Sequence, residues 1–266
     1  MNKVKFFYKY GTNIDIDTEK SVEVYIDEII VTPVPVDEIR IVVLDEPLKS
    51  GLFDFVRDNC NCYTYLLTFH EELLNNNPNA RLLHANTNPW IHNYVSPNKR
   101  FRVSVLVGGK DEPTMGGYKL RHDLWNNQHK INIPKDFYLS SHNKWRKVNY
   151  VGQNVLGDSK VPLFDSMFHV AIENTSIKDY FSEKILDCFQ SRTVPIYWGC
   201  RNIMDYFNMD GILVVGSLDD IVRACNSLTP ETYQRMISAM EDNFDRSCRW
   251  CDYIDRLKNA VTELIK

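Results

Sequence analysis

The chain has 266 residues, of which 44% are hydrophobic, and a formal net charge of -4. This length exceeds the roughly 100–200 residues of one domain, so two domains with separate cores are expected. Because no cluster of Lys and Arg is present to neutralise phosphates, the composition argues against a nucleic-acid or anionic-membrane partner.

The N-terminus begins with a short strand-like pattern over residues 4–10. It has neither a signal-peptide core nor the roughly 20 apolar residues of a membrane span. The 7 cysteines, an odd number, are typical of a reducing compartment, so the protein is expected to be cytoplasmic. Cys60, Cys62, Cys248 and Cys251 would make a zinc set, but the last two lie on one face of a long predicted helix, which favours thiols.

Short strands alternate with helical segments in the first part of the chain, which predicts a small α/β domain. These segments are residues 22–26, 38–44, 63–68, 71–74 and 81–84. Residues 86–99 are rich in Asn, Pro and Trp, and Pro89 and Pro97 interrupt any regular element, which predicts a linker. The predicted domains are therefore residues 1–95 and residues 96–266.

The second part of the chain has the repeating pattern of a parallel sheet. Residues 101–107 read as a buried strand that ends at Gly108 and Gly109, and residues 118–128 as the helix that follows. Further strands are expected at residues 168–172, 194–198 and 211–215, and Thr229 before Pro230 predicts a helix start. Nucleotides bind such sheets at the carboxyl ends of the strands.

Polar side chains gather after the strand that Ile172 closes, just before a helical pattern resumes at Ile185. A helix N-terminus presents unpaired N–H groups and the positive end of the helix dipole, and Lys184 in the first turn adds a full charge. The segment therefore predicts a site for a diphosphate. Its polar residues are Glu173, Asn174, Lys178, Asp179, Tyr180, Glu183 and Lys184.

The order of residues in this segment resembles the signature of the alpha-1,3-fucosyltransferases, glycosyltransferase family 10. The signature residues are Glu-Asn at 173–174, Asp-Tyr at 179–180, Glu-Lys at 183–184 and Val-Pro-Ile-Tyr-Trp-Gly at 194–199. A looser similarity runs from Ile39 to Gly216. The resemblance implies an α/β, GT-B-like fold, with two Rossmann-like domains facing a cleft and a shortened N-terminal domain.

In that fold residues 1–95 would form the acceptor-side domain, and residues 96–266 the donor-binding domain with terminal helices. Eukaryotic relatives are Golgi membrane proteins. Because this sequence shows no such anchor, the resemblance implies a short soluble microbial or viral member acting in the cytoplasm, or in the host cytoplasm if viral.

The resemblance also assigns donor contacts. Arg121 and Lys184 would hold the diphosphate of the donor, and Glu183 would accept hydrogen bonds from its ribose hydroxyls. The alternatives are a solvated helix charge for either cation and, for Glu183, an acid stabilised by the helix dipole.

Three further side chains have weaker assignments in the same segment. Asn174 and Tyr180 resemble positions that orient the donor, and Glu173 would lie near its sugar. The alternative for Asn174 and Tyr180 is a role in stabilising the loop.

A general base is the remaining requirement, and the family uses a glutamate after a strand in a Glu-Ser-Pro-like context. Glu46, which follows the apolar run 41–44, matches in position and would contribute about 10²–10⁴-fold to the rate. Pro47 follows Glu46 directly, without the intervening Ser. Asp45, a shifted alignment or an ordinary loop acid therefore stay open as alternatives.

No metal site is predicted. Asp15 and Asp17 match an Asp-x-Asp metal motif, but they precede the core of the first domain, which favours a solvated hairpin. No two histidines have convincing metal-ligand spacing, although His122 lies beside Arg121. The resemblance implies no required cofactor, with manganese stimulating some members.

The predicted function is an inverting glycosyltransferase that moves fucose from GDP-fucose to a hydroxyl of a glycan acceptor. One alternative is a transferase that uses another nucleotide-sugar donor. Another is a non-catalytic protein that binds a nucleotide sugar or glycan, which would have kept the donor site and lost the base.

Overall fold

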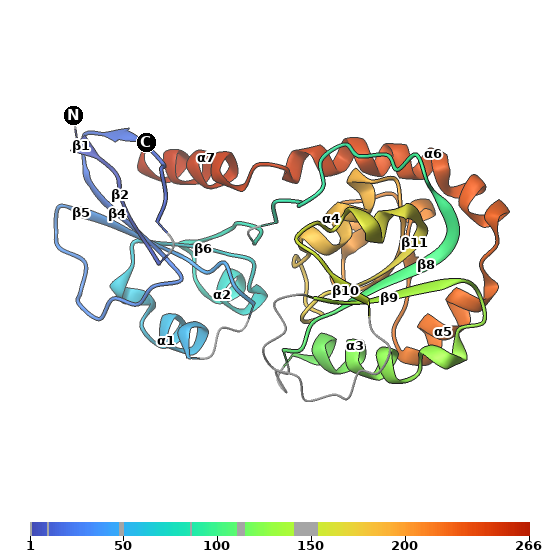
Figure 1. Ribbon diagram of the computed structural model, residues 1–266. Coiled ribbons are helices and arrows are strands. Elements are labelled where there is room, and N and C mark those ends of the chain that lie inside the picture. The colour runs from blue at the N-terminus through green and yellow to red at the C-terminus, as the bar shows by residue number, and fades with distance from the viewer. Residues whose placement is uncertain (1, 10, 48–50, 86, 111–114, 141–153) are drawn as a thin grey trace. The chain divides into compact units, whose positions relative to one another are not determined.

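A computed structural model describes residues 2–9, 11–47, 51–85, 87–110, 115–140 and 154–266 (Figure 1). They form two compact units. The first unit comprises Met1–Thr87, Lys178–Tyr180 and Asp252–Lys266, and the second comprises Asn88–Ile177 and Phe181–Cys251. The division thus falls after Thr87 rather than after residue 95, and the last helix groups with the first unit instead of the second.

The first unit contains, in its described residues, a five-stranded sheet whose strand pairs are all parallel. Its strands lie in chain order, β2-β4-β5-β6-β7, without the reversal of a doubly wound Rossmann sheet. The elements are β1 (Asn2–Lys3), β2 (Lys5–Tyr8), β3 (Asp17–Thr18), β4 (Ser21–Ile26), β5 (Glu38–Val43), α1 (Leu52–Asp58), β6 (Tyr65–Thr68), α2 (Glu71–Asn76), β7 (Ala80–Leu82) and α7 (Tyr253–Ile265).

Helices cover both faces of this sheet, because successive residues of a strand point to opposite sides. Ile41 and Val43 of β5 pack in one core with Leu257 of α7. Val42 and the following Leu44 pack in a second core with residues of α1 and α2. The C-terminal helix therefore completes the first unit, which explains why α7 belongs to it.

The second unit has, among the residues described, a six-stranded parallel sheet in the order β10-β9-β8-β11-β12-β13. The order reverses between β8 and β11, which is the doubly wound Rossmann arrangement that the family resemblance implied for this part of the chain. The elements are β8 (Arg100–Val107), α3 (Gly116–Asn126), β9 (Lys135–Ser140), β10 (Asn154–Leu156), β11 (Ser166–Ile172), α4 (Glu183–Gln190), β12 (Val194–Trp198), β13 (Leu213–Val214), α5 (Leu218–Ser227) and α6 (Pro230–Ser247).

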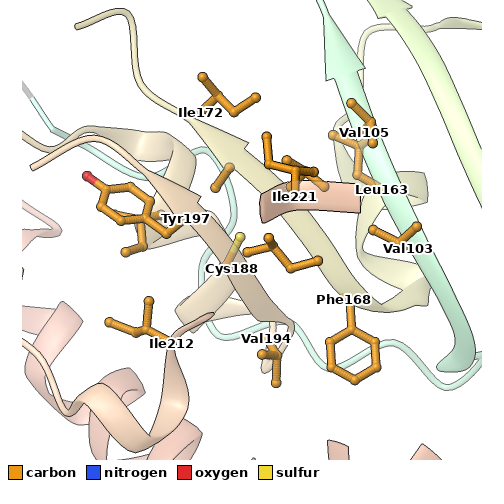
Figure 2. Close-up of a cluster of buried hydrophobic side chains, with 14 of the residues drawn as sticks. Val103, Val105, Leu163, Phe168, Ile172, Cys188, Val194, Tyr197, Ile212 and Ile221 are labelled. Atoms are coloured by element: carbon orange, nitrogen blue, oxygen red, sulfur yellow. The ribbon is translucent and has the colours of Figure 1, made fainter. Parts of the chain in front are cut away.

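The core of the second unit forms where side chains of β8, β11 and β12 meet those of the helices (Figure 2). Val103 and Val105 of β8 are fully buried, as is Phe168 of β11, and Ile221 of α5 packs in the same cluster. Strands buried on both faces have nearly continuous apolar sequences. This explains why the sequence placed β8, β11 and β12 within two residues of their observed ends.

The predicted linker is fixed against the second unit. Residues 87–99 are described and contain no helix or strand. The amides of Trp90 and Ile91 donate to Asp187 Oδ1 of α4 at 2.6 and 3.0 Å, and the amide of Tyr94 donates to the carbonyl of Gln190 at 3.0 Å. The segment thus satisfies side-chain and carbonyl acceptors of α4.

Cys248 and Cys251 do not lie in one long helix, so that prediction was wrong. Helix α6 ends at Ser247, and Cys248–Trp250 forms a 3-10 turn in which Trp250 packs edge-on against Phe181. All seven cysteines are free thiols. The described residues contain no group of three or more His, Cys, Asp or Glu side chains that could hold a metal ion.

Asp15 and Asp17 both contact Lys3 Nζ, at 2.7 and 2.8 Å, beside the antiparallel pair formed by β1 and β3. Both carboxylates are largely exposed. Their charge is therefore balanced by a lysine of the neighbouring strand. In the part of the chain that the structure describes, no helix is long and apolar enough to cross a lipid bilayer.

Candidate functional site

A cavity of about 250 Å³ lies in the second unit, at the carboxyl ends of β8 and β11. This is the point where the strand order reverses and where ligands bind in open α/β sheets. Its lining includes Leu106 and Gly108 from the end of β8, Ala171 and Ile172 from β11, and Glu183 and Lys184 from α4. Arg121 of α3 also lines it.

The N-terminus of α4 is built by the residues that follow β11. Ser182 is its N-cap, with extended backbone and a side-chain oxygen that accepts from the amide of Lys184. Glu173, fully buried, accepts from the amide and hydroxyl of Ser182 at 2.8 and 2.5 Å. The Glu173 carboxylate therefore fixes the start of α4, and this contact explains its burial without any ligand.

Lys184 carries one of the positive charges at this cavity, which Arg121 and Lys160 also line. Its ammonium lies 3.1 Å from Glu183 Oε1 and 3.7 Å from Glu173 Oε2. Burial lowers the pKa of Lys184, but the charges of Glu183 and Glu173 together raise it by more. The net pKa therefore lies above its ordinary value. The side chain is therefore protonated at neutral pH, as an anion-binding role requires.

Glu183 is ionised because two lysines face it. Lys160 Nζ lies 3.6 Å from the same Oε1 atom that Lys184 contacts, and also 3.1 Å from Asp187 Oδ2. Burial would raise the pKa of Glu183, but Lys184 and Lys160 outweigh it and lower the pKa to about 2. For Glu173 and Asp187, by contrast, burial dominates and raises the pKa.

Helix α3 approaches the loop after β11 very closely. The amide of Gly117 donates to the carbonyl of Asn174 at 3.0 Å. Arg121 Nη2 donates to Asn174 Oδ1 at 2.7 Å and its Nε to the carbonyl of Gly117 at 3.1 Å, while the guanidinium lies over the Tyr118 ring. These contacts hold the Arg121 guanidinium against the loop that leads to Lys184. His122 contacts the carbonyl of Gly108 at 3.1 Å through its Nε2 atom.

Five of the predicted site residues belong to the second unit and come from α3, the loop after β11 and the first turn of α4. They are Arg121, Glu173, Asn174, Glu183 and Lys184. Tyr180 groups with the first unit, where it is 3% exposed and its ring lies 5.4 Å from the ring of Phe69. It is thus a packed aromatic side chain.

Glu46 follows β5 in the first unit, and its side chain is exposed. Its backbone carbonyl accepts a hydrogen bond from His70. The alternative residue, Asp45, is buried, and its amide donates to Asp27 Oδ1 at 2.9 Å. Of the two acids, only Glu46 has a carboxylate open to solvent.

Ser182, Lys160 and Asp187, which lie in or against the first turns of α4, were not predicted from the sequence. Ser182 was detectable, because a serine directly before a helical pattern is a typical N-cap. Lys160 and Asp187 were not, because their pairing joins positions far apart in the sequence, and no local pattern reports it.

The part of the chain that contains this site is similar to known proteins. Residues 157–216 match the family model described as "Glycosyltransferase family 10 (fucosyltransferase) C-term". The alpha-(1,3)-fucosyltransferase FucT of Helicobacter pylori is 26% identical over 117 residues, which are 44% of this chain and 20% of that protein. The match thus spans about one fifth of the length of the curated relative.

Solved structures share the fold. A crystal structure of an alpha1,3-fucosyltransferase with GDP-fucose aligns over 88% of this chain and 77% of its own, with a TM-score of 0.54 and 17% identity. The pneumococcal O-GlcNAc transferase GtfA, in complex with UDP and GlcNAc, aligns over 91% of this chain and 56% of its own, with a TM-score of 0.51 and 10% identity.

The expected α/β fold with parallel sheets is therefore confirmed, and its structural neighbours are GT-B glycosyltransferases. The family match contains Glu173 and Asn174 of the loop after β11 and Glu183 and Lys184 of the first turn of α4. The resemblance of this chain to the alpha-1,3-fucosyltransferases of glycosyltransferase family 10 is confirmed, most directly for residues 157–216.

Proposed function

We propose that the protein is an inverting glycosyltransferase that moves fucose from GDP-fucose to a hydroxyl group of a glycan. The observation that carries the proposal is the convergence of Lys184, Arg121 and the N-terminus of α4 at the cavity where the sheet order reverses. Cations and helix amides at one point suit the diphosphate of a nucleotide sugar. The match to family 10 and the GDP-fucose bound by a protein of the same fold support this donor.

In the proposed reaction the acceptor hydroxyl loses its proton to Glu46 and its oxygen attacks the anomeric carbon. The bond from that carbon to the diphosphate oxygen breaks, and GDP leaves with the bonding electrons on the opposite side. Arg121 and Lys184 stabilise the negative charge that develops on the leaving diphosphate, so the proposal requires no metal ion. Manganese remains a proposed stimulant rather than a requirement.

Glu183 is the proposed ribose contact. The two lysines keep its carboxylate ionised, and the side chain lines the cavity. Its oxygens can therefore accept hydrogen bonds from ribose hydroxyl groups. Asn174 is proposed to orient the donor through Arg121. The roles proposed for Glu173 and Tyr180 have less support, because both side chains are buried in structural contacts.

Nucleotide-dependent thermal stabilisation tests the donor. A ligand that binds only the folded state adds about 2.7 kcal/mol at 100 times its dissociation constant. We expect GDP and GDP-fucose to raise the melting temperature, with UDP and GDP-mannose weaker, and Lys184→Ala to lose most of the shift. A preference for UDP or for another GDP-sugar would retain the transferase and discard fucose, whereas no shift with any nucleotide would overturn the proposed function.

A further inference from the structure

His169 lies on the wall of the candidate cavity and has no role in the proposed diphosphate and ribose contacts. It sits in β11, is 6% exposed and lines the cavity together with Leu106, Leu163 and Phe164. Most of a strand's buried positions in such a sheet are apolar. A histidine facing a cavity at the sheet reversal therefore needs a chemical explanation.

The partner of His169 on the neighbouring strand fixes one side of its ring. Ser104 of β8 lies directly opposite in the parallel register, and its Oγ is 2.8 Å from His169 Nδ1. The same Oγ is 2.7 Å from the carbonyl oxygen of Leu163. A carbonyl oxygen only accepts, so the single hydroxyl proton of Ser104 goes to Leu163. His169 Nδ1 must then donate its N–H to Ser104.

This assignment leaves Nε2 of a neutral ring without a proton and so makes it a hydrogen-bond acceptor. Burial lowers the pKa of His169 to about 3, so the ring stays neutral throughout the physiological pH range. Among the residues that the structure describes, the only hydrogen-bond partner of the ring is Ser104. Among the described residues, an acceptor atom of this largely buried ring thus lines the cavity without a protein donor.

The surroundings of His169 select the ligand group. Leu106, Leu163 and Phe164 make the adjacent wall apolar, and the Phe164 ring lies 5.5 Å from the imidazole ring. A phosphate has no proton to give a neutral acceptor at neutral pH and would be held instead by Lys184 and Arg121. A ribose hydroxyl has Glu183 as its acceptor. A flat heterocycle with an N–H on its edge satisfies both the apolar wall and the acceptor.

We propose that His169 Nε2, on the cavity wall beside Leu163 and Phe164, accepts a hydrogen bond from an N–H group of the donor's nucleobase. This inference rests on the proposed function, because it assumes a nucleoside diphosphate donor.

Histidine-selective ¹⁵N NMR of the wild-type protein tests this directly. The free protein should show the His169 signature of a neutral ring protonated at Nδ1. Saturating GDP should shift the Nε2 resonance of His169 toward the value of a hydrogen-bonded nitrogen. Inorganic pyrophosphate, which has no base, should bind through Lys184 and Arg121 and leave that resonance unchanged.

A matched pair of substitutions gives the energetic test by calorimetry. His169→Asn retains an amide near the position of Nδ1 to bond Ser104 but removes the acceptor at Nε2, whereas His169→Gln carries its amide oxygen near the position of Nε2. We expect His169→Asn to bind GDP about 3- to 10-fold more weakly, the loss of one neutral hydrogen bond, and His169→Gln to recover most of that loss. Pyrophosphate should bind all three proteins equally.

The outcomes separate the two proposals. If neither GDP nor any other nucleotide binds the wild-type protein, the proposed function fails and this inference fails with it. If GDP binds the wild-type protein while the His169 resonance does not move, the base lies elsewhere, and this inference alone is wrong. Equal weakening of GDP and pyrophosphate by His169→Asn would assign His169 a purely structural role and overturn the inference too.

Discussion

The amide of Gly117 donates a 3.0 Å hydrogen bond to the carbonyl of Asn174, which joins the first turn of α3 to the loop after β11. This contact brings the two backbones so close that a Cβ atom on Gly117 would lie 1.7 Å from the carbonyl oxygen of Glu173. The approach places Arg121, one turn along α3, within reach of the Asn174 side chain. The geometry of the cationic site therefore depends on a residue without a side chain.

Gly117→Ala should therefore force α3 away from the loop, because neither backbone can yield without breaking the hydrogen bond. Overpacking of this kind costs about 1–3 kcal/mol, and GDP binding should weaken along with stability. Gly116→Ala is the control, since its Cβ would meet only the Trp198 ring at 3.6 Å, an ordinary contact. Chemical denaturation and GDP titration of both variants check the prediction, and equal behaviour of the two would contradict it.

Arg121 and Asn174 should act as one unit. A hydrogen bond to a charged group contributes about 1.5–3 kcal/mol, and here it holds the guanidinium in position. We expect Asn174→Ala and Arg121→Gln each to weaken GDP binding, and the double variant to be little worse than Arg121→Gln alone. The double-mutant cycle for GDP affinity measures this coupling. Additive effects would mean that Asn174 contacts the donor independently of Arg121.

Lys184→Ala should reduce turnover by about 10²–10³-fold, by analogy with the loss of one donor to a developing oxyanion. The substitution also removes a counter-charge from Glu183 and Glu173, so folding must be checked by circular dichroism. Lys178→Ala is the matched control, because its ammonium lies 3.5 Å from exposed Glu71. Near-normal turnover by a folded Lys184→Ala protein would remove the leaving-group role.

Substitutions of the two adjacent acids after β5 should have different effects on turnover and stability. Glu46→Gln should lower turnover by about 10²–10⁴-fold and leave the thermal shift by GDP unchanged, because an exposed general base does not bind the donor. Asp45→Asn should instead lower the stability, since Asp45 is buried. Turnover and GDP melting curves of both variants make the comparison. The opposite pattern would assign the base to Asp45, and unchanged turnover in both would favour a non-catalytic binding protein.

The sequence predicted the parts of this fold that depend on local pattern. Strand β12 has the predicted ends, Val194 and Trp198, because a compact apolar run between polar segments admits few alternatives. The start of α4 was found for the same reason, since its polar residues follow a strand directly. Both are short-range features of the chain.

The sequence could not predict which core an amphipathic element joins. The apolar face of α7, which includes Leu257, could pack against the apolar face of either sheet. Only the three-dimensional structure shows that it covers the sheet of the first unit. The pairing of Lys160 with Asp187 and the Ser104–His169 contact also escaped prediction. These contacts join residues that are adjacent only after the sheet has formed.

Stability should fall as the pH is lowered from about 6.5 to about 4, partly because of His70. Burial lowers the pKa of this histidine from 6.5 to about 4, and its ring packs 4.6 Å from Phe69 and 4.8 Å from Phe53. The folded-state pKa is below the unfolded value, so in this window the unfolded chain binds a proton that the native protein does not. The stabilisation is complete above the unfolded pKa and is lost as the pH falls.

One such group contributes at most about 1.4 kcal/mol of unfolding free energy per pH unit. His70→Gln has an amide that can still donate to the Glu46 carbonyl but does not titrate, so its unfolding free energy should depend less steeply on pH. Urea unfolding of both proteins between pH 7 and pH 5, above the range in which most carboxylates titrate, measures the difference in slope. Identical slopes would mean that His70 is protonated to the same extent in both states, and that burial does not keep it neutral in the folded protein.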